Sequence, residues 1–183
     1  MWRRALRQPL TWFFVVVIGV LAGVGLWWFQ PWKLVTDRVV DESLPVIVAD
    51  PAGSPPSAGP ITPGAGSQVL ATGEFISHEH ETTGTAHIVR LADGSRQLVL
   101  RDLDTSNGPD LRVWLTDQPV IEGTAGWRVF DDGRWVELAR LKGNRGDQVY
   151  TIPPSTDLTG MRSVSIWCKR FAVSFGAAEL RTT

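Results

Sequence analysis

The feature that most constrains this chain is an uncharged, apolar run over residues 10–29. A helix rises about 1.5 Å per residue, so a run of this length covers the roughly 30 Å hydrocarbon core of a bilayer. Lipid offers backbone N–H and C=O groups no partner, and a lone segment that crosses a membrane is therefore helical. The sequence predicts one transmembrane α-helix over residues 10–29.

The charges that flank this run predict its orientation. Three arginines, Arg3, Arg4 and Arg7, precede the run, and a mixed-charge stretch follows it. Because positive residues are retained on the cytoplasmic side, residues 1–9 are expected in the cytoplasm and the C-terminal domain outside it. We therefore expect a single-pass protein of the plasma membrane with an extracytoplasmic domain.

A cleaved signal peptide is the alternative interpretation of the same segment. Val20 and Ala22 are small enough to precede a cleavage site, and the three arginines suit either interpretation. The apolar run is longer than the about 7–15 residues of a typical signal-peptide core. Its length favours the membrane anchor.

Residues 30–67 are expected to form an extracytoplasmic linker. Its second part, PAGSPPSAGPITPGAGS over residues 51–67, consists mostly of Pro, Gly and Ser. Such a composition has little apolar surface to bury and does not compensate the entropy lost on ordering. The sequence predicts a flexible spacer here, and it leaves the short apolar run 44–48 open between a strand and a membrane contact.

Residues 68–183 have the pattern of short strands separated by turns, without an amphipathic helical stretch. Strands are expected at 85–91, 97–103, 110–116, 126–130, 135–141, 148–152, 163–168 and 171–175. The dipeptides Asp93-Gly94 and Asp132-Gly133 predict two hairpins, because glycine adopts the positive φ that a tight turn requires. The predicted fold class is all-β: an antiparallel β-sandwich or barrel-like domain, preceded by the transmembrane helix and the flexible linker.

The last two predicted strands have opposite parity. Val164, Ile166 and Cys168 share one side of the first strand, whereas the apolar residues of the second strand have the other parity. Side chains alternate with period two, so the register must break near Lys169-Arg170. A bulge or tight corner is expected directly after Cys168.

Composition excludes several classes of function. The chain has 18 Lys and Arg against 19 Asp and Glu, and this overall balance gives no electrostatic drive towards nucleic acid or an acidic membrane surface. Its single cysteine excludes an intrachain disulfide and a multi-cysteine zinc site. The sequence also lacks the motifs of common hydrolases and nucleotide-binding enzymes, and we do not expect a classical enzyme.

Four segments carry a resemblance to a known family. They are Gly73-Glu74-Phe75 followed by Thr83-Gly84-Thr85-Ala86, NGPDLRVWL at 107–115, LKGNRGDQVYTIP at 141–153 and SVSIWCKRFAVSFGAAEL at 163–180. Over nearly all of the region after the linker, the chain resembles the DM-thirteen, or electron-transfer DM-thirteen, domain family. The resemblance implies an extracytoplasmic, β-rich module of the membrane-anchored bacterial type. It also implies a redox or electron-transfer role centred on a characteristic cysteine, which corresponds to Cys168.

Cys168 is therefore the first candidate for chemistry, as a thiol-redox or electron-transfer group. An unpaired thiol in an oxidising compartment is either shielded or available for exchange. Lys169 and Arg170 would favour the thiolate of a partly exposed sulfur. The alternative is a structural cysteine in a non-catalytic binding or scaffold module of the cell envelope.

His78, His80 and His87 are weaker candidates, for a metal site. His78 and His80 are two residues apart and share one face of a strand. Together with Cys168, the histidines would provide the ligand types of a trigonal copper site. The C-x-x-C-H motif of covalent haem is absent. The sequence does not firmly imply any cofactor, and it leaves the cofactor, the redox or envelope-protein partner and the oligomeric state open.

Overall fold

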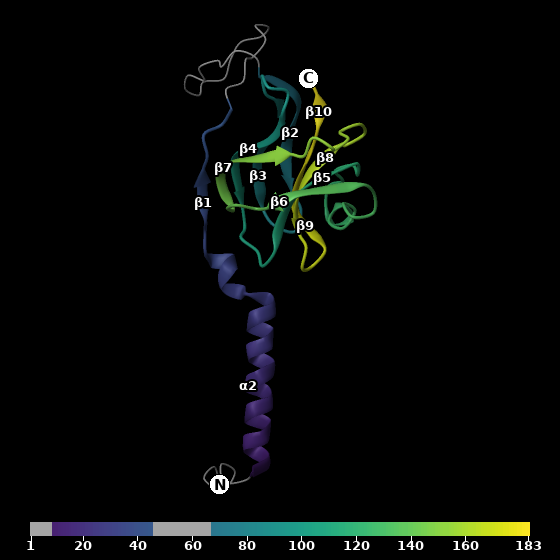
Figure 1. The fold of residues 1–183 in the computed structure, drawn as a ribbon. Coiled ribbons are helices and arrows are strands. Elements are labelled where there is room, and N and C mark those ends of the chain that lie inside the picture. Colours follow the sequence, from purple (N-terminus) through teal and green to yellow (C-terminus); the bar gives the residue numbers. More distant parts are fainter. Residues whose placement is uncertain (1–8, 46–66) are drawn as a thin grey trace.

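The computed structural model describes residues 9–45 and 67–183. Its first element is the helix α2, Pro9–Phe29, which extends away from the β domain (Figure 1). The helix contains the segment predicted to cross the membrane, and its apolar side chains are exposed. Within the described ranges, this is the one helix long and apolar enough to span a membrane, by its length and composition.

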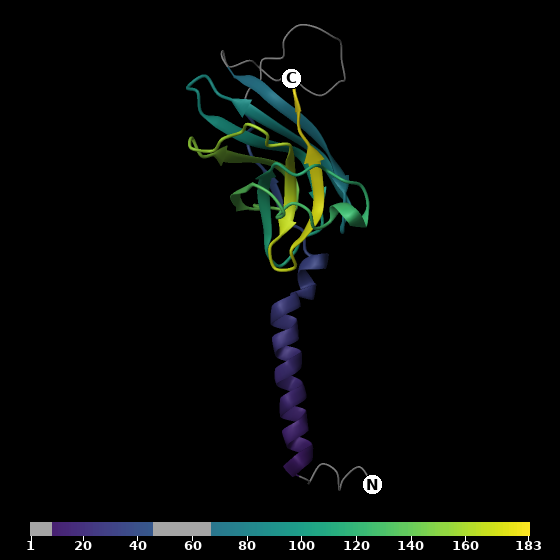
Figure 2. The ribbon, with the colours of Figure 1, turned by 90° about the vertical axis from the view of Figure 1, so that its right-hand side faces the viewer.

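A short 3-10 helix, η1, Pro31–Val35, and the strand β1, Val39–Asp41, follow the long helix. The β domain then contains β2, Gln68–Ser77; β3, Thr82–Arg90; β4, Arg96–Thr105; β5, Leu111–Thr116; β6, Trp135–Arg140; β7, Arg145–Ile152; β8, Ser163–Cys168; β9, Val173–Glu179; and β10, Arg181–Thr182. The 3-10 helix η2, Thr124–Gly126, lies in the connection between β5 and β6. Figure 2 shows the β domain gathered at one end of the helix.

The strands form one curled sheet in the order β1-β7-β4-β3-β2-β9-β8-β5-β6, with β10 paired to β2. The strand β2 joins its two halves, because Gln68 to Glu74 pair with β3 and Phe75 to Ser77 pair with β9. The strand pairs are antiparallel except for β1 and β7, which are parallel. The predicted all-β class, with a sandwich or barrel-like domain after one apolar helix, is confirmed.

The hairpin predicted through Asp93-Gly94 is confirmed. The strands β3 and β4 pair antiparallel, and the Leu91 N–H donates to the Ser95 carbonyl at 2.8 Å. Gly94 has φ +82°, the left-handed conformation that favours glycine in a tight turn.

The hairpin predicted through Asp132-Gly133 is wrong. The partner of β6 is β5, and residues 126–130 form no strand but belong to the loop 117–134. Phe130 of this loop is fully buried and packs edge-on against Trp167, with ring centroids 6.3 Å apart. Val129 and Phe130 pack in the cluster on the outer face of the sheet, whereas Trp127 packs against the main core. Their alternation with polar residues resembles the pattern of a strand, although the segment is a loop.

The segment after the helix is attached to the β domain. Its strand β1 pairs with β7, and the Arg38 N–H donates to Asn144 Oδ1 at 2.7 Å. Lys142 and Glu42 form an ion pair at 2.7 Å. The strand β1, Arg38 and Glu42 fall in the range 30–67 that the sequence assigned to a linker. Residues 46–66 of that range lie outside the described residues. The domain boundaries remain a prediction.

The main core fills the space between the two halves of the curled sheet. Its largest fully buried side chains include Leu98, Leu100, Leu103, Leu115, Ile152 and Ile166. A second, smaller cluster lies on the outer face of β5 and β8 and contains Trp114, Phe130 and Trp167. The strand β8 is therefore buried on both of its faces.

Candidate functional site

Cys168 is the last residue of β8 and lies between two neighbouring strands. It is paired with Leu111 of β5 and with Val173 of β9. Its side chain is fully buried, at 0% exposure, and belongs to the main core cluster with Val164 and Ile166. The predicted common side of these three residues is confirmed, and that side faces the core.

The surroundings of Cys168 disfavour its thiolate. Burial raises the pKa of the thiol, and the backbone N–H groups of Phe171, Asp110 and Arg170 offset this effect only in part. The neighbouring cations have other partners, since Lys169 Nζ lies 3.1 Å from Glu137 Oε2 and Arg170 contacts the helix. Because the thiolate is the reactive form, the folded protein holds this sulfur in a weakly nucleophilic state.

A tight turn over residues 169–172, which we call the 169–172 turn, follows Cys168 directly. The Lys169 N–H donates to the Asp110 carbonyl at 2.9 Å, and the Phe171 N–H donates to the Cys168 carbonyl at 3.2 Å. Ala172 has φ +49°, a conformation that non-glycine residues seldom adopt. The predicted break near Lys169-Arg170 is confirmed as this turn.

The 169–172 turn contacts the last turn of α2. Arg170 Nη1 donates to the carbonyl of Trp28, and its guanidinium lies 5.3 Å from the centroid of the Trp28 ring. The rings of Phe29 and Phe171 are stacked, with centroids 5.6 Å apart. The segment that follows the thiol is thus the segment that joins the domain to the helix.

The three candidate histidines have separate protein partners. His78 is 8% exposed, and its Nδ1 and Nε2 atoms lie 2.9 Å from Ser174 Oγ and 3.1 Å from the Ile121 carbonyl oxygen. His87 lies between Thr72 and Thr85, with ring nitrogens 3.2 Å and 3.0 Å from their hydroxyl oxygens.

His80 differs from the other two in that its ring packs on Phe175, with centroids 3.9 Å apart. Burial lowers the pKa of His78, His80 and His87. Among residues 9–45 and 67–183, no group of three or more His, Cys, Asp or Glu side chains is arranged to hold a metal ion. The structure does not bring the three histidines and Cys168 together as a ligand set.

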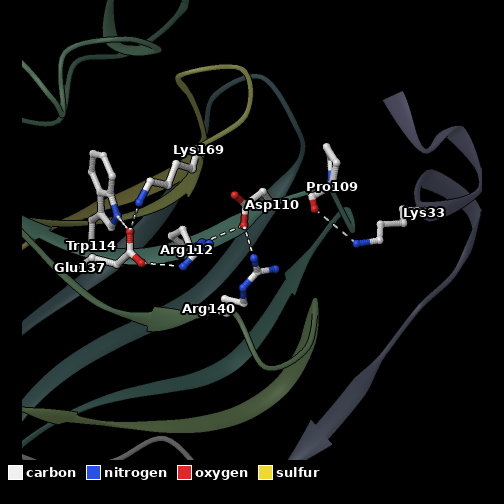
Figure 3. Close-up of polar contacts among 8 residues, drawn as sticks. All are labelled: Lys33, Pro109, Asp110, Arg112, Trp114, Glu137, Arg140 and Lys169. Atoms are coloured by element: carbon white, nitrogen blue, oxygen red, sulfur yellow. Dashed lines mark hydrogen bonds and ion pairs between the residues drawn. The ribbon is translucent and has the colours of Figure 1, made fainter. Parts of the chain in front are cut away.

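A network of charged side chains around β5 and β6 includes Lys169, the residue that follows Cys168 in the sequence (Figure 3). Arg112 lies between two carboxylates, 2.8 Å from Asp110 Oδ1 and 2.6 Å from Glu137 Oε1. Burial opposes ionisation of both carboxyls, but their hydrogen bonds and the neighbouring cations, Lys169 among them, outweigh it. The pKa of each therefore lies below its ordinary value.

Three tryptophans form a continuous stack next to this network. The ring centroids of Trp135 and Trp114 are 4.0 Å apart, and those of Trp114 and Trp167 are 5.0 Å apart. Trp114 Nε1 donates to Glu137 Oε2 at 3.3 Å, which connects the stack to the ion pairs. The stack begins at Trp135, which is 40% exposed, and ends at the buried Trp167.

Neither this network nor the stack is predicted by the sequence. The alternation of β5 placed Arg112 and Trp114 on its polar face, which was the available signal. Their partners Glu137 and Trp135 lie on β6, and the pairing of β6 with β5 was not predicted. The long-range pairing was the missing information.

Together these features define a class of protein: an all-β domain with a buried thiol, carried beside an apolar helix of membrane-spanning length. The chain belongs to the electron transfer DM13 family, whose model matches residues 74–180. This match confirms the family resemblance and assigns a general electron-transfer or redox character to the domain. Comparisons with curated proteins and with solved structures gave no match.

Proposed function

We propose that this chain is a membrane-anchored, extracytoplasmic electron-transfer module. The direct contact between the last turn of α2 and the 169–172 turn carries this proposal, because it joins the family domain to an apolar helix. The arginines before the helix favour a cytoplasmic N-terminal segment. The apolar side chains of α2 are exposed, as expected of a surface that meets lipid.

The anchor is tested on the full chain in its membrane fraction. We expect the protein to resist extraction by alkaline carbonate and to be released by detergent. Protease added from the extracytoplasmic side should digest the linker and leave the N-terminal segment protected. A chain that appears in the soluble fraction after cleavage near residue 22 would instead be the product of a signal peptide.

Within this module, we propose that Cys168 acts in thiol–disulfide exchange when the 169–172 turn opens. In the opened state the thiol of Cys168 is exposed and loses its proton to solvent. Its sulfur then attacks a disulfide of an envelope protein. A mixed disulfide forms, and the other sulfur of the partner leaves as a thiolate. The adjacency of Cys168 to the tight 169–172 turn supports this gating, since local opening of a short turn exposes the sulfur without global unfolding.

The test is the rate at which N-ethylmaleimide modifies Cys168 in the folded full chain. We expect slow modification of the native protein and about tenfold faster modification of Phe171→Ala, equivalent to about 1.4 kcal/mol of weaker turn closure. The matched control is Phe75→Ala, which removes a buried phenyl ring of the same core far from the turn. Equal acceleration by both variants indicates global unfolding and contradicts the gating.

The second candidate function is a non-catalytic binding or scaffold module with a structural cysteine. The complete burial of Cys168 and the raised pKa of its thiol favour this alternative. This alternative predicts that Cys168 is modified only when the whole domain unfolds. Once the modification rates are corrected for the different stabilities of the two chains, the native chain and Phe171→Ala should then react equally fast. It also predicts that no mixed disulfide forms with envelope proteins in intact cells.

A further inference from the structure

The surface around the 169–172 turn carries a group of cations at the end of the β domain that faces α2. In both views, the loop between β8 and β9 lies at this end of the domain (Figure 1 and Figure 2). We propose that this surface binds the headgroups of anionic phospholipids and so holds the domain against the bilayer. This inference rests on the proposed membrane anchor.

The length of α2 sets the depth of the turn. Its 21 residues extend over about 31 Å, close to the roughly 30 Å thickness of the hydrocarbon core. Its last residues, Trp27 to Phe29, therefore lie at the interface, where aromatic side chains are enriched in membrane proteins. The Phe171 ring stacks on Phe29, so the 169–172 turn lies at the depth of the lipid headgroups.

Cations outnumber carboxylates on this surface. The cations are Lys33, Arg112, Arg128, Arg140, Lys169 and Arg170, and the carboxylates are Asp110, Glu137 and Glu79. Lys33 Nζ donates to the Pro109 carbonyl at 3.4 Å, and Arg140 lies 3.4 Å from Asp110 (Figure 3). The surplus of positive charge is complementary to an anionic bilayer surface.

Arg128 and Arg170 are the members best placed to bind a phosphate. Arg128 Nη1 donates to the carbonyls of Phe171 and Ala172, both at 3.1 Å. Arg170 contacts backbone carbonyls and indole rings of the helix. In the described part of the chain neither guanidinium forms an ion pair at contact distance, and Arg170 acts on Asp110 only by helping to lower the pKa of that carboxyl. Each guanidinium therefore retains N–H donors for a lipid phosphate.

The basic surplus is confined to one side of the helix end. On the β1 side, Arg145 is shared by two carboxylates, at 2.9 Å from Asp37 and 3.0 Å from Asp104. The charges there are largely compensated. The geometry therefore assigns the lipid contact to the surface formed by the 169–172 turn and the neighbouring ends of β5 and β6.

The experiment uses the full chain in nanodiscs of phosphatidylcholine and in nanodiscs with an equimolar mixture of phosphatidylcholine and phosphatidylglycerol. Hydrogen exchange of the peptide that covers the 169–172 turn is measured in both. We expect exchange about fivefold slower in the anionic discs. Salt at about 1 M should remove the difference, because it screens charges beyond about 3 Å.

The double variant Arg128→Gln with Arg170→Gln tests the assigned residues. We expect its exchange rates in the two lipids to become equal, whatever its absolute rate, because the comparison between lipids cancels any intrinsic loosening of the turn. The matched control is Arg90→Gln with Arg181→Gln, which removes the same charge from exposed positions on β3 and β10. This control should retain the fivefold difference.

The outcomes separate the docking from the anchor. A native chain that does not co-elute with the discs overturns both. A chain that co-elutes but exchanges equally in the two lipids overturns the docking alone. If the control variant also abolishes the difference between the two lipids, the docking alone is overturned. The difference then reflects the net charge of the chain rather than the assigned surface.

Discussion

The two faces of β8 differ in chemistry although both are buried. The inner face carries Val164, Ile166 and Cys168 and lies in the aliphatic core. The outer face carries Ser165 and Trp167, which lie beneath the loop 117–134 and next to hydrogen-bonded groups. The comparison teaches that burial alone does not define the chemistry of a site. The inner face places the thiol among aliphatic side chains. On the outer face, the hydroxyls of Ser163 and Ser165 donate to the Gln118 carbonyl and to Ser174 Oγ.

The largest expected effect is on the outer face, for Trp167→Ala. This substitution removes a fully buried indole that stacks on Trp114 and contacts Phe130. We expect the free energy of unfolding to fall by about 3–5 kcal/mol, measured by urea denaturation of the full chain in detergent. Trp135→Ala, at the exposed end of the same stack, is the control. An equal effect of both substitutions would contradict the importance of burial in the stack.

The next effect is on the inner face, for Cys168→Ser. The hydroxyl is placed in an aliphatic core, and we expect the free energy of unfolding to fall by about 1–3 kcal/mol. Cys168→Ala introduces no polar group and should cost less, measured by the same denaturation. If serine is tolerated as well as alanine, the backbone N–H groups of Phe171, Asp110 and Arg170 satisfy the hydroxyl, and the two faces are less different than their side chains indicate.

The contrast also explains what the sequence could predict. The helix, the β class, the Asp93-Gly94 turn and the side of β8 that carries Cys168 follow from local rules of hydropathy, period and turn geometry. The period of two assigns Trp167 to the other face but does not reveal that a loop covers it. The partner of β6, the attachment of β1 and the depth of Cys168 depend on contacts between residues far apart in the sequence, which one sequence does not specify.

A smaller effect is expected for Glu137→Gln on the outer surface. The change removes the negative charge between Arg112 and Lys169 and retains an acceptor for Trp114. We expect a loss of about 1 kcal/mol in the free energy of unfolding, and less at high salt. Asp157→Asn, in the exposed pair with Arg134, is the control and should have a weaker effect. Equal effects would show that the partly buried network adds nothing to its separate pairs.

The smallest effect is the contribution of His78 to the pH dependence of stability. Burial lowers the pKa of His78 in the folded protein, so the unfolded chain binds a proton at a higher pH than the folded one. The stabilisation is complete above the ordinary histidine pKa of about 6.5 and is lost as the pH falls through the lowered value. His80 and His87 act in the same direction, because burial lowers the pKa of both.

The measurement is the midpoint of urea denaturation between about pH 7 and pH 5, above the range in which Asp and Glu are protonated. We expect the native chain to lose stability over this interval and His78→Gln to lose less, because glutamine does not titrate. His80→Gln is the control for a half-buried ring that packs on Phe175 rather than beneath the loop 117–134. If the slope with pH is unchanged in His78→Gln, the histidine accepts a proton without loss of its contacts to Ser174 and Ile121. The outer face of β8 would then accommodate a charge, which would make its difference from the inner face larger still.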